Sequence, residues 1–204
     1  MSNTKIAVIY YSSTGGNTQM ARWAADAAKE AGAEVRLLKA HELAPDVAID
    51  SNPLWRKNVN ETADIPEATS ADLEWADGII FSSPSRFGVM ASQLKQFIDL
   101  QGGLWAQGKL ANKAVTAMAT AGNPHGGQEE VIQSIYTVMQ HWSTILVPTG
   151  YINQSTFGAG GNPYGSSATI SQDGEVVDAK NIQPAVADQA KRLVQVATAL
   201  KNGL

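Results

Sequence analysis

Five short apolar runs alternate with helical patterns along this chain, and this alternation constrains its fold more than any other feature. The first run, residues 6–11, is continuous rather than alternating in polarity. Strands that are buried on both faces of a parallel sheet have this pattern. Strands alternating with helices imply right-handed crossovers within such a sheet. The sequence therefore predicts parallel strands at residues 6–11, 35–38, 77–82, 114–119 and 144–147.

The segments between these runs predict helices and two excursions. Apolar residues at helical spacing predict helices near 20–31, 91–100 and 131–139, and a last one from about Pro184. The excursions are residues 41–76, which we expect to contain short helices or line a site, and residues 151–178. The expected fold is a three-layer, doubly wound α/β sheet with insertions and strand order 2-1-3-4-5. Residues 1–204 form one domain in this prediction, with ligands at the carboxyl ends of the strands.

The composition of the chain argues against nucleic acid and membranes as binding partners. The 204 residues are 44% hydrophobic and 17% charged, which is typical of a globular protein. The net charge of -4 gives no basic field for nucleic acid. The absence of cysteine excludes disulfides and thiolate chemistry and suits a reducing compartment. The first apolar run is too short to span a membrane. We expect a cytoplasmic protein without membrane insertion.

A polar, glycine-rich loop follows the first predicted strand. Such a loop before a helix forms an anion site, because backbone N–H groups converge there and small residues allow close approach. It lacks the Gly-Lys-Ser/Thr ending of a nucleoside triphosphate loop and the Gly-x-Gly-x-x-Gly of a dinucleotide fold. An ordinary helix cap and turn explains the same residues, so the loop alone favours phosphate only modestly. Its residues are Ser12, Ser13, Thr14, Gly15, Gly16, Asn17 and Thr18.

Two further loops follow the third and fourth predicted strands. In the loop at 82–90, Pro84, Phe87 and Arg86 offer apolar contacts and hydrogen bonds to a flat ring such as a flavin. The loop at 119–129 is rich in glycine, so its main chain can bond a ring edge. Each loop alone is also explained as an ordinary turn, with Phe87 in the core. His and carboxylate residues do not cluster at ligand spacing, so we predict no metal site.

Six short motifs together resemble one family, the WrbA-type NAD(P)H:quinone oxidoreductases, whose fold is flavodoxin-like. The motifs occur in the family's order and span nearly the whole chain. The first loop departs from the family's usual Tyr-Gly-His, with Thr14-Gly15-Gly16 in its place. The matching motifs are YYS at 10–12, SPSRFG at 83–88, GGLW at 102–105, GGQE at 126–129, VPxGY at 147–151 and PYG at 163–165.

The resemblance implies a flavoprotein tetramer that binds one FMN per subunit without a covalent bond. Neighbouring subunits complete the cavity above the flavin. Trp105 forms a wall of that cavity, His141 contacts flavin or substrate, and Tyr151 is a weaker candidate; spacing alone favours structural roles for Trp105 and His141. With Arg86 these are the predicted catalytic residues. Besides the first loop and His141, the implied cofactor-binding residues are Pro84, Ser85, Arg86, Phe87, Gly88, Thr120, Ala121, Gly122, Asn123 and Gly126.

The function implied by the resemblance is a dehydrogenase activity: two-electron, ping-pong reduction of a quinone by NAD(P)H through FMN. One alternative is a carrier flavodoxin that passes single electrons to protein partners. Carriers tend to be strongly acidic, whereas this chain has a net charge of only -4. A binding protein without flavin on the same fold is a second alternative, since fold alone does not determine function.

Overall fold

The sheet at the centre of the molecule has the predicted strand order. The computed structural model describes residues 3–203, and its strands follow the path β2-β1-β3-β5-β6. Every pair along this path is parallel, which confirms the order 2-1-3-4-5 for the five predicted runs. The strands are β1 (Lys5–Tyr10), β2 (Glu34–Lys39), β3 (Gly78–Arg86), β4 (Val89–Met90), β5 (Ala114–Ala121), β6 (Ile145–Leu146) and β7 (Ser167–Thr169).

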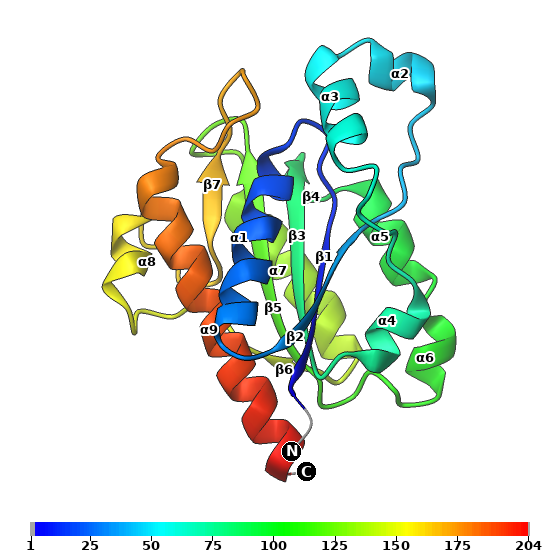
Figure 1. The fold of residues 1–204 in the computed structure, drawn as a ribbon, viewed down its shortest axis with the longest axis vertical. Coiled ribbons are helices and arrows are strands. Elements are labelled where there is room, and N and C mark those ends of the chain that lie inside the picture. The colour runs from blue at the N-terminus through cyan, green and yellow to red at the C-terminus, as the bar shows by residue number, and fades with distance from the viewer. Residues whose placement is uncertain (1–2, 204) are drawn as a thin grey trace.

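Helices cover both faces of this sheet, giving three layers (Figure 1). In β1, Ala7 and Ile9 belong to a core shared with α5 and α7, while Ile6 and Val8 belong to a second core shared with α1 and α9. Successive side chains of a strand point to opposite faces, so a strand covered on both sides must be apolar throughout. The helices are α1 (Gly16–Glu30), α2 (Asp46–Asp50), α3 (Pro53–Glu61), α4 (Ser70–Trp75), α5 (Ser92–Asp99), α6 (Gly102–Ala106), α7 (Gln128–His141), α8 (Gln154–Gly158) and α9 (Ala179–Gly203).

The far edge of the sheet is split between two short strands. β6 pairs with Ala114 and Val115 at the start of β5, whereas β7 pairs in parallel with residues 119–121 at its end. The chain between β6 and β7 leaves the sheet and carries α8. The sequence marks this region as an excursion but does not predict β7, because three residues flanked by Gly and Ser have no detectable periodicity.

The first excursion contains helices, as expected. Between β2 and β3 the chain forms α2, α3 and α4. The side chain of Asn52 accepts hydrogen bonds from the first-turn N–H groups of α3, and Pro53 begins that helix. Thr69 and Asp72 form a capping box at α4. Figure 1 shows α2 and α3 beside the carboxyl ends of β1 and β3.

The last helix begins earlier than the sequence predicts. α9 starts at Ala179, so Pro184 lies inside the helix rather than at its start. Pro184 is the sixth residue of α9, beyond the four N–H groups that lack intrahelical partners, so its missing N–H leaves one backbone hydrogen bond of the helix unmade. Among residues 3–203, no helix has the length and apolar character needed to cross a bilayer.

Candidate functional site

The three loops singled out in the sequence meet at the carboxyl edge of the sheet. They line one pocket of about 170 Å³. The loops follow β1, β3 and β5, which are adjacent strands, and ligands of open α/β sheets bind in this position. The pocket is lined by Ser12, Ser13, Thr14, Gly16, Asn17, Pro84, Ser85, Arg86, Thr120, Ala121, Gly122, Ile170 and Ser171.

The first loop presents the N-terminus of α1 to this pocket. Gly15 is the N-cap with φ 106°, a left-handed conformation that glycine adopts readily. Its N–H donates to the Oγ of Ser12 over 3.1 Å, which closes the turn. Among the described residues no side chain caps this helix, so the N–H groups of its first turn are available to an anion. The loop therefore fits a phosphate group.

Asn17 fixes the start of α1 to two strands. Its side chain is buried, where its Nδ2 donates to the Oγ1 of Thr120 over 2.7 Å and its Oδ1 accepts from the Oγ of Ser82 over 2.8 Å. Both amide atoms are engaged in these contacts. The side chain of Asn17 thus has a structural role at the start of α1, which the sequence does not reveal.

The second loop is a tight hairpin between β3 and β4. Phe87 and Gly88 form its two-residue turn with φ of 56° and 85°. A phenylalanine is rarely found in this left-handed conformation, and its side chain is fully exposed rather than in the core. The guanidinium Nη2 of Arg86 donates to the Oγ of Ser13 over 3.0 Å, so a cation spans the first two loops at the pocket rim.

The third loop is attached to the second. The Oγ of Ser85 donates to the carbonyl oxygen of Gly126 over 2.5 Å and accepts from the N–H of Gly88 over 3.2 Å. A Cβ built on Gly127 would lie 2.8 Å from the Cα of Gly88. Only glycine allows the two backbones to pack this closely. The pocket walls on these two sides therefore form one rigid unit.

A fourth wall comes from the segment after β7, which the sequence does not single out. Ile170 pairs with Val176, and the turn between them packs on the first loop. A Cβ built on Gly16 would lie 2.4 Å from the Cδ1 of Ile170, and one on Gly174 would lie 2.4 Å from the carbonyl oxygen of Thr14. The Asp173-Gly174 pair is a turn signal, but no local pattern reveals which loop the turn covers.

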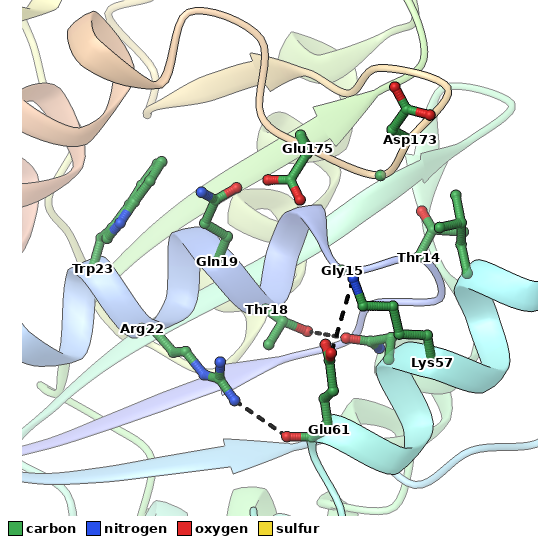
Figure 2. A pocket seen from close by; sticks show the side chains of 13 residues that line it. Thr14, Gly15, Thr18, Gln19, Arg22, Trp23, Lys57, Glu61, Asp173 and Glu175 are labelled. Atoms are coloured by element: carbon green, nitrogen blue, oxygen red, sulfur yellow. Dashed lines mark hydrogen bonds and ion pairs between the residues drawn. The ribbon is translucent and has the colours of Figure 1, made fainter.

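A second pocket, of about 230 Å³, lies on the other side of the first loop (Figure 2). Its charges are mixed, since Arg22 and Lys57 are accompanied by Glu61, Asp173 and Glu175. The Nη2 of Arg22 donates to the backbone carbonyl of Glu61 over 3.3 Å, and the Nζ of Lys57 lies 3.9 Å from the Glu61 carboxylate. The three carboxylates outnumber the two cations, so the pocket does not favour an anion.

The other three predicted catalytic residues lie away from the 170 Å³ pocket of their own chain. α7 runs back from the third loop, and His141 ends it shortly before β6, which pairs at the start of β5. The Nε1 of Trp105 donates to the carbonyl oxygen of His141 over 2.8 Å, and Figure 1 shows α6 far from the loop between β1 and α1. Tyr151 stacks on Phe157 at 5.2 Å in the segment between β6 and β7. All three side chains are exposed.

The fold and its strand-end pocket define a flavodoxin-like protein. The flavodoxin, WrbA-like protein from Agrobacterium tumefaciens has a similar structure, with a TM-score of 0.62 over 98% of this chain and 99% of that one at 17% identity. A flavodoxin from the domain Archaea matches with a TM-score of 0.60 over 97% of this chain and 99% of its own, at 16% identity. At these identities the likeness shows the fold alone.

Sequence similarity shows the family. Residues 4–158 match the NADPH-dependent FMN reductase family, and this chain belongs to it. A Deinococcus radiodurans protein named NAD(P)H dehydrogenase (quinone) is 47% identical over 196 residues, which cover 96% of each chain. A Brucella anthropi protein of the same name is 37% identical over 97% of this chain and 99% of its own. These findings confirm the resemblance to WrbA-type quinone oxidoreductases.

Proposed function

We propose that this protein reduces quinones with NAD(P)H in two-electron steps, using FMN held non-covalently in the pocket between the three loops. The observation that carries the proposal is the meeting of these loops beside an uncapped helix N-terminus. The family assignment supports FMN and NAD(P)H, and the relatives are named for NAD(P)H and quinone. We further place the protein in the cytoplasm, which suits a chain without cysteine.

Each loop has a distinct role in this proposal. FMN bound in the pocket would supply the two-electron redox chemistry that links NAD(P)H to a quinone. Residues 12–18 bind the FMN phosphate through backbone N–H groups and through the hydroxyls of Ser12, Ser13 and Thr14, whereas the hydroxyl of Thr18 donates to Asn58. Residues 84–88 contact the flat ring, where Arg86 favours added negative charge. Thr120, Ala121, Gly122, Asn123 and Gly126 bond the other edge of the ring.

Neighbouring subunits supply the remaining residues in this proposal. Trp105, His141 and Tyr151 are exposed and do not line the pocket of their own chain, so in this proposal they reach a flavin across a subunit interface. A tetramer satisfies this requirement. Trp105 then walls the cavity in which nicotinamide and quinone bind in turn. His141 orients or protonates the quinone oxygen, since an imidazole exchanges protons near neutral pH.

Spectra of the FMN-loaded protein test the function directly. Adding NADH in the absence of oxygen should bleach the flavin absorption, and benzoquinone added next should restore it. Steady turnover without any partner protein supports the enzyme. Bleaching that only a protein acceptor reverses would instead indicate a single-electron carrier, and a protein that takes up no FMN would contradict both. If His141→Ala leaves quinone turnover unchanged with FMN bound, its proposed role is wrong.

A further inference from the structure

Asn58 joins the two ends of the first loop from a distant part of the chain. It lies on α3 and is 6% exposed, although most of this short helix faces solvent. Its Nδ2 donates to the backbone carbonyl of Ser12 over 2.9 Å, and its Oδ1 accepts from the Oγ1 of Thr18 over 2.8 Å. The carbonyl can only accept, so the orientation of the amide is fixed. Figure 2 marks the bond at Thr18.

These two bonds fix the parts of the loop that set its shape. The carbonyl of Ser12 marks the exit from β1, and Thr18 lies in the first turn of α1. Between them the backbone reverses at Gly15, and a Cβ built on Gly15 would lie 3.9 Å from the Oδ1 of Asn58. The amide therefore supports the loop from the side opposite the 170 Å³ pocket.

A partly buried carboxylate, that of Glu42, anchors the helix that carries Asn58. The Nε1 of Trp55, one turn earlier on α3, donates to the Oε2 of Glu42 over 3.0 Å. Glu42 also accepts from the hydroxyl of Tyr11 over 3.0 Å and from the Nε2 of Gln93 over 2.8 Å. These contacts tie α3 to the end of β1 and to α5, so Asn58 holds the loop against a fixed support.

We propose that Asn58 is a positioning residue for the flavin phosphate. By bridging Ser12 and Thr18, it keeps the N–H groups of the loop in the arrangement that binds an anion before the cofactor arrives. A preformed site loses less conformational entropy on binding. Because the preformed part is the loop that binds the phosphate, the gain in affinity should apply to ligands that carry a phosphate. The proposal rests on the proposed function only in that FMN is the ligand of this pocket.

Riboflavin separates this role from a purely structural one, because it has the ring of FMN but no phosphate. We would prepare the apoprotein from the flavin-loaded protein and titrate each ligand by quenching of flavin fluorescence. Asn58→Ala removes two hydrogen bonds to the loop, so FMN affinity should fall by about tenfold while riboflavin affinity changes by less than about twofold. Asn60→Ala is the matched control, since Asn60 is exposed on the same helix, and it should change neither affinity.

Equal losses for FMN and riboflavin, or no loss for either, would overturn the proposal. If Asn58→Ala does not fold, Thr18→Val gives the same comparison, because it removes one of the two bonds in a nearly unchanged shape. Its FMN affinity should fall by about threefold, again with riboflavin affinity nearly constant. Wild-type protein that binds no FMN contradicts the proposed function instead. If the wild-type protein binds FMN but the variants have the same ratio of FMN affinity to riboflavin affinity as the wild type, only the role of Asn58 is contradicted.

Discussion

Gly16 shows at the scale of one residue how packing restricts the candidate site. WrbA-type proteins usually have histidine at the matching position of the first loop. Here the Cδ1 of Ile170 lies 2.4 Å from the point where a Cβ would stand. A side chain fits in that space only if Ile170 shifts. The departure of the first loop from the family pattern is thus coupled to a residue more than 150 positions later in the chain.

Gly16→Ala should therefore weaken FMN binding. The new methyl group overlaps Ile170, and overpacking of this kind costs roughly 1–3 kcal/mol. FMN titration of Gly16→Ala, Ile170→Ala and the double variant measures the coupling between the two positions. We expect the double variant to bind FMN more tightly than Gly16→Ala alone. Strictly additive losses would show that Ile170 is not the obstacle.

The residues of the candidate site differ in how far the sequence reveals them. The three loops are predictable, because adjacent parallel strands bring their carboxyl ends to one edge and the loop compositions suit a flavin. Asn58 and Ile170 are not predictable, because each reaches the first loop through long-range packing. Asn17 is predicted as a phosphate ligand, but its side chain bonds Thr120 and Ser82. Local sequence identifies the polar residue without identifying its partner.

At the scale of elements, Glu42 connects β1, α3 and α5. Burial opposes its charge, but hydrogen bonds from the backbone of Ala44 and from the side chains of Gln93, Trp55 and Tyr11 outweigh this effect and lower the pKa of Glu42. Burial and the Glu42 carboxylate raise the pKa of Tyr11. The tyrosine therefore remains a donor throughout the neutral range. The ionised carboxylate is the form that holds the three elements together.

Glu42→Gln should reduce stability in a pH-dependent way. A glutamine replaces one acceptor oxygen with a donor, which should lower the free energy of unfolding by about 2–3 kcal/mol at pH 7. Because the folded-state pKa is lowered, the wild-type advantage is complete above the usual pKa of 4.5 and disappears as pH falls through the folded-state value. Urea unfolding at several pH values measures the difference between the two proteins.

Glu130→Gln is a suitable control for this measurement, because Glu130 is exposed in the first turn of α7. It should alter the free energy of unfolding by less than about 0.5 kcal/mol. A stability difference between wild type and Glu42→Gln that stays constant with pH would contradict the role of the ionised carboxylate.

The strands and long helices are predictable from the sequence, whereas several boundaries are not. Short, mainly apolar runs identify β1, β2, β3 and β5. β3 extends to Arg86, beyond its apolar run, because its end pairs with β4 rather than packing in the core. β7 is held by pairing with β5 and by the burial of Ala168 in the core, both of which are long-range contacts. α9 passes through Pro184 because packing against α1 and the sheet outweighs the local signal for a helix start.

At the scale of the whole molecule, residues from more than one chain line each cavity above the flavin in the proposed tetramer. Arg86→Ala and Trp105→Ala should each lower quinone turnover when present in every subunit. Assemblies re-formed from a mixture of the two variants should recover part of the lost activity, since roughly a quarter of the cavities then combine two intact contributions. Turnover per flavin measures the recovery.

Mixtures in which each variant is assembled before mixing provide the control, because their subunits remain separate. These mixtures should give only the average of the two variants. The same average from the re-formed assemblies would indicate that Arg86 and Trp105 act within one chain, and a monomeric mass in solution would contradict the tetramer itself.

The split edge of the sheet has a consequence for how such subunits join. β6 has two residues and β7 has three. The chain leaves the sheet between these two strands, so the row of backbone groups along this edge is interrupted. At the opposite edge, residues 66 and 68 bond the backbone of Lys39 in β2, and the guanidinium of Arg36 stacks on Trp75 at 4.0 Å. Among the residues that the structure describes, the border formed by β6 and β7 offers no long row of open hydrogen-bonding groups to a foreign strand, and the end of the opposite border is already paired at Lys39. Chains of this protein should therefore associate through side-chain surfaces and resist aggregation by pairing of edge strands.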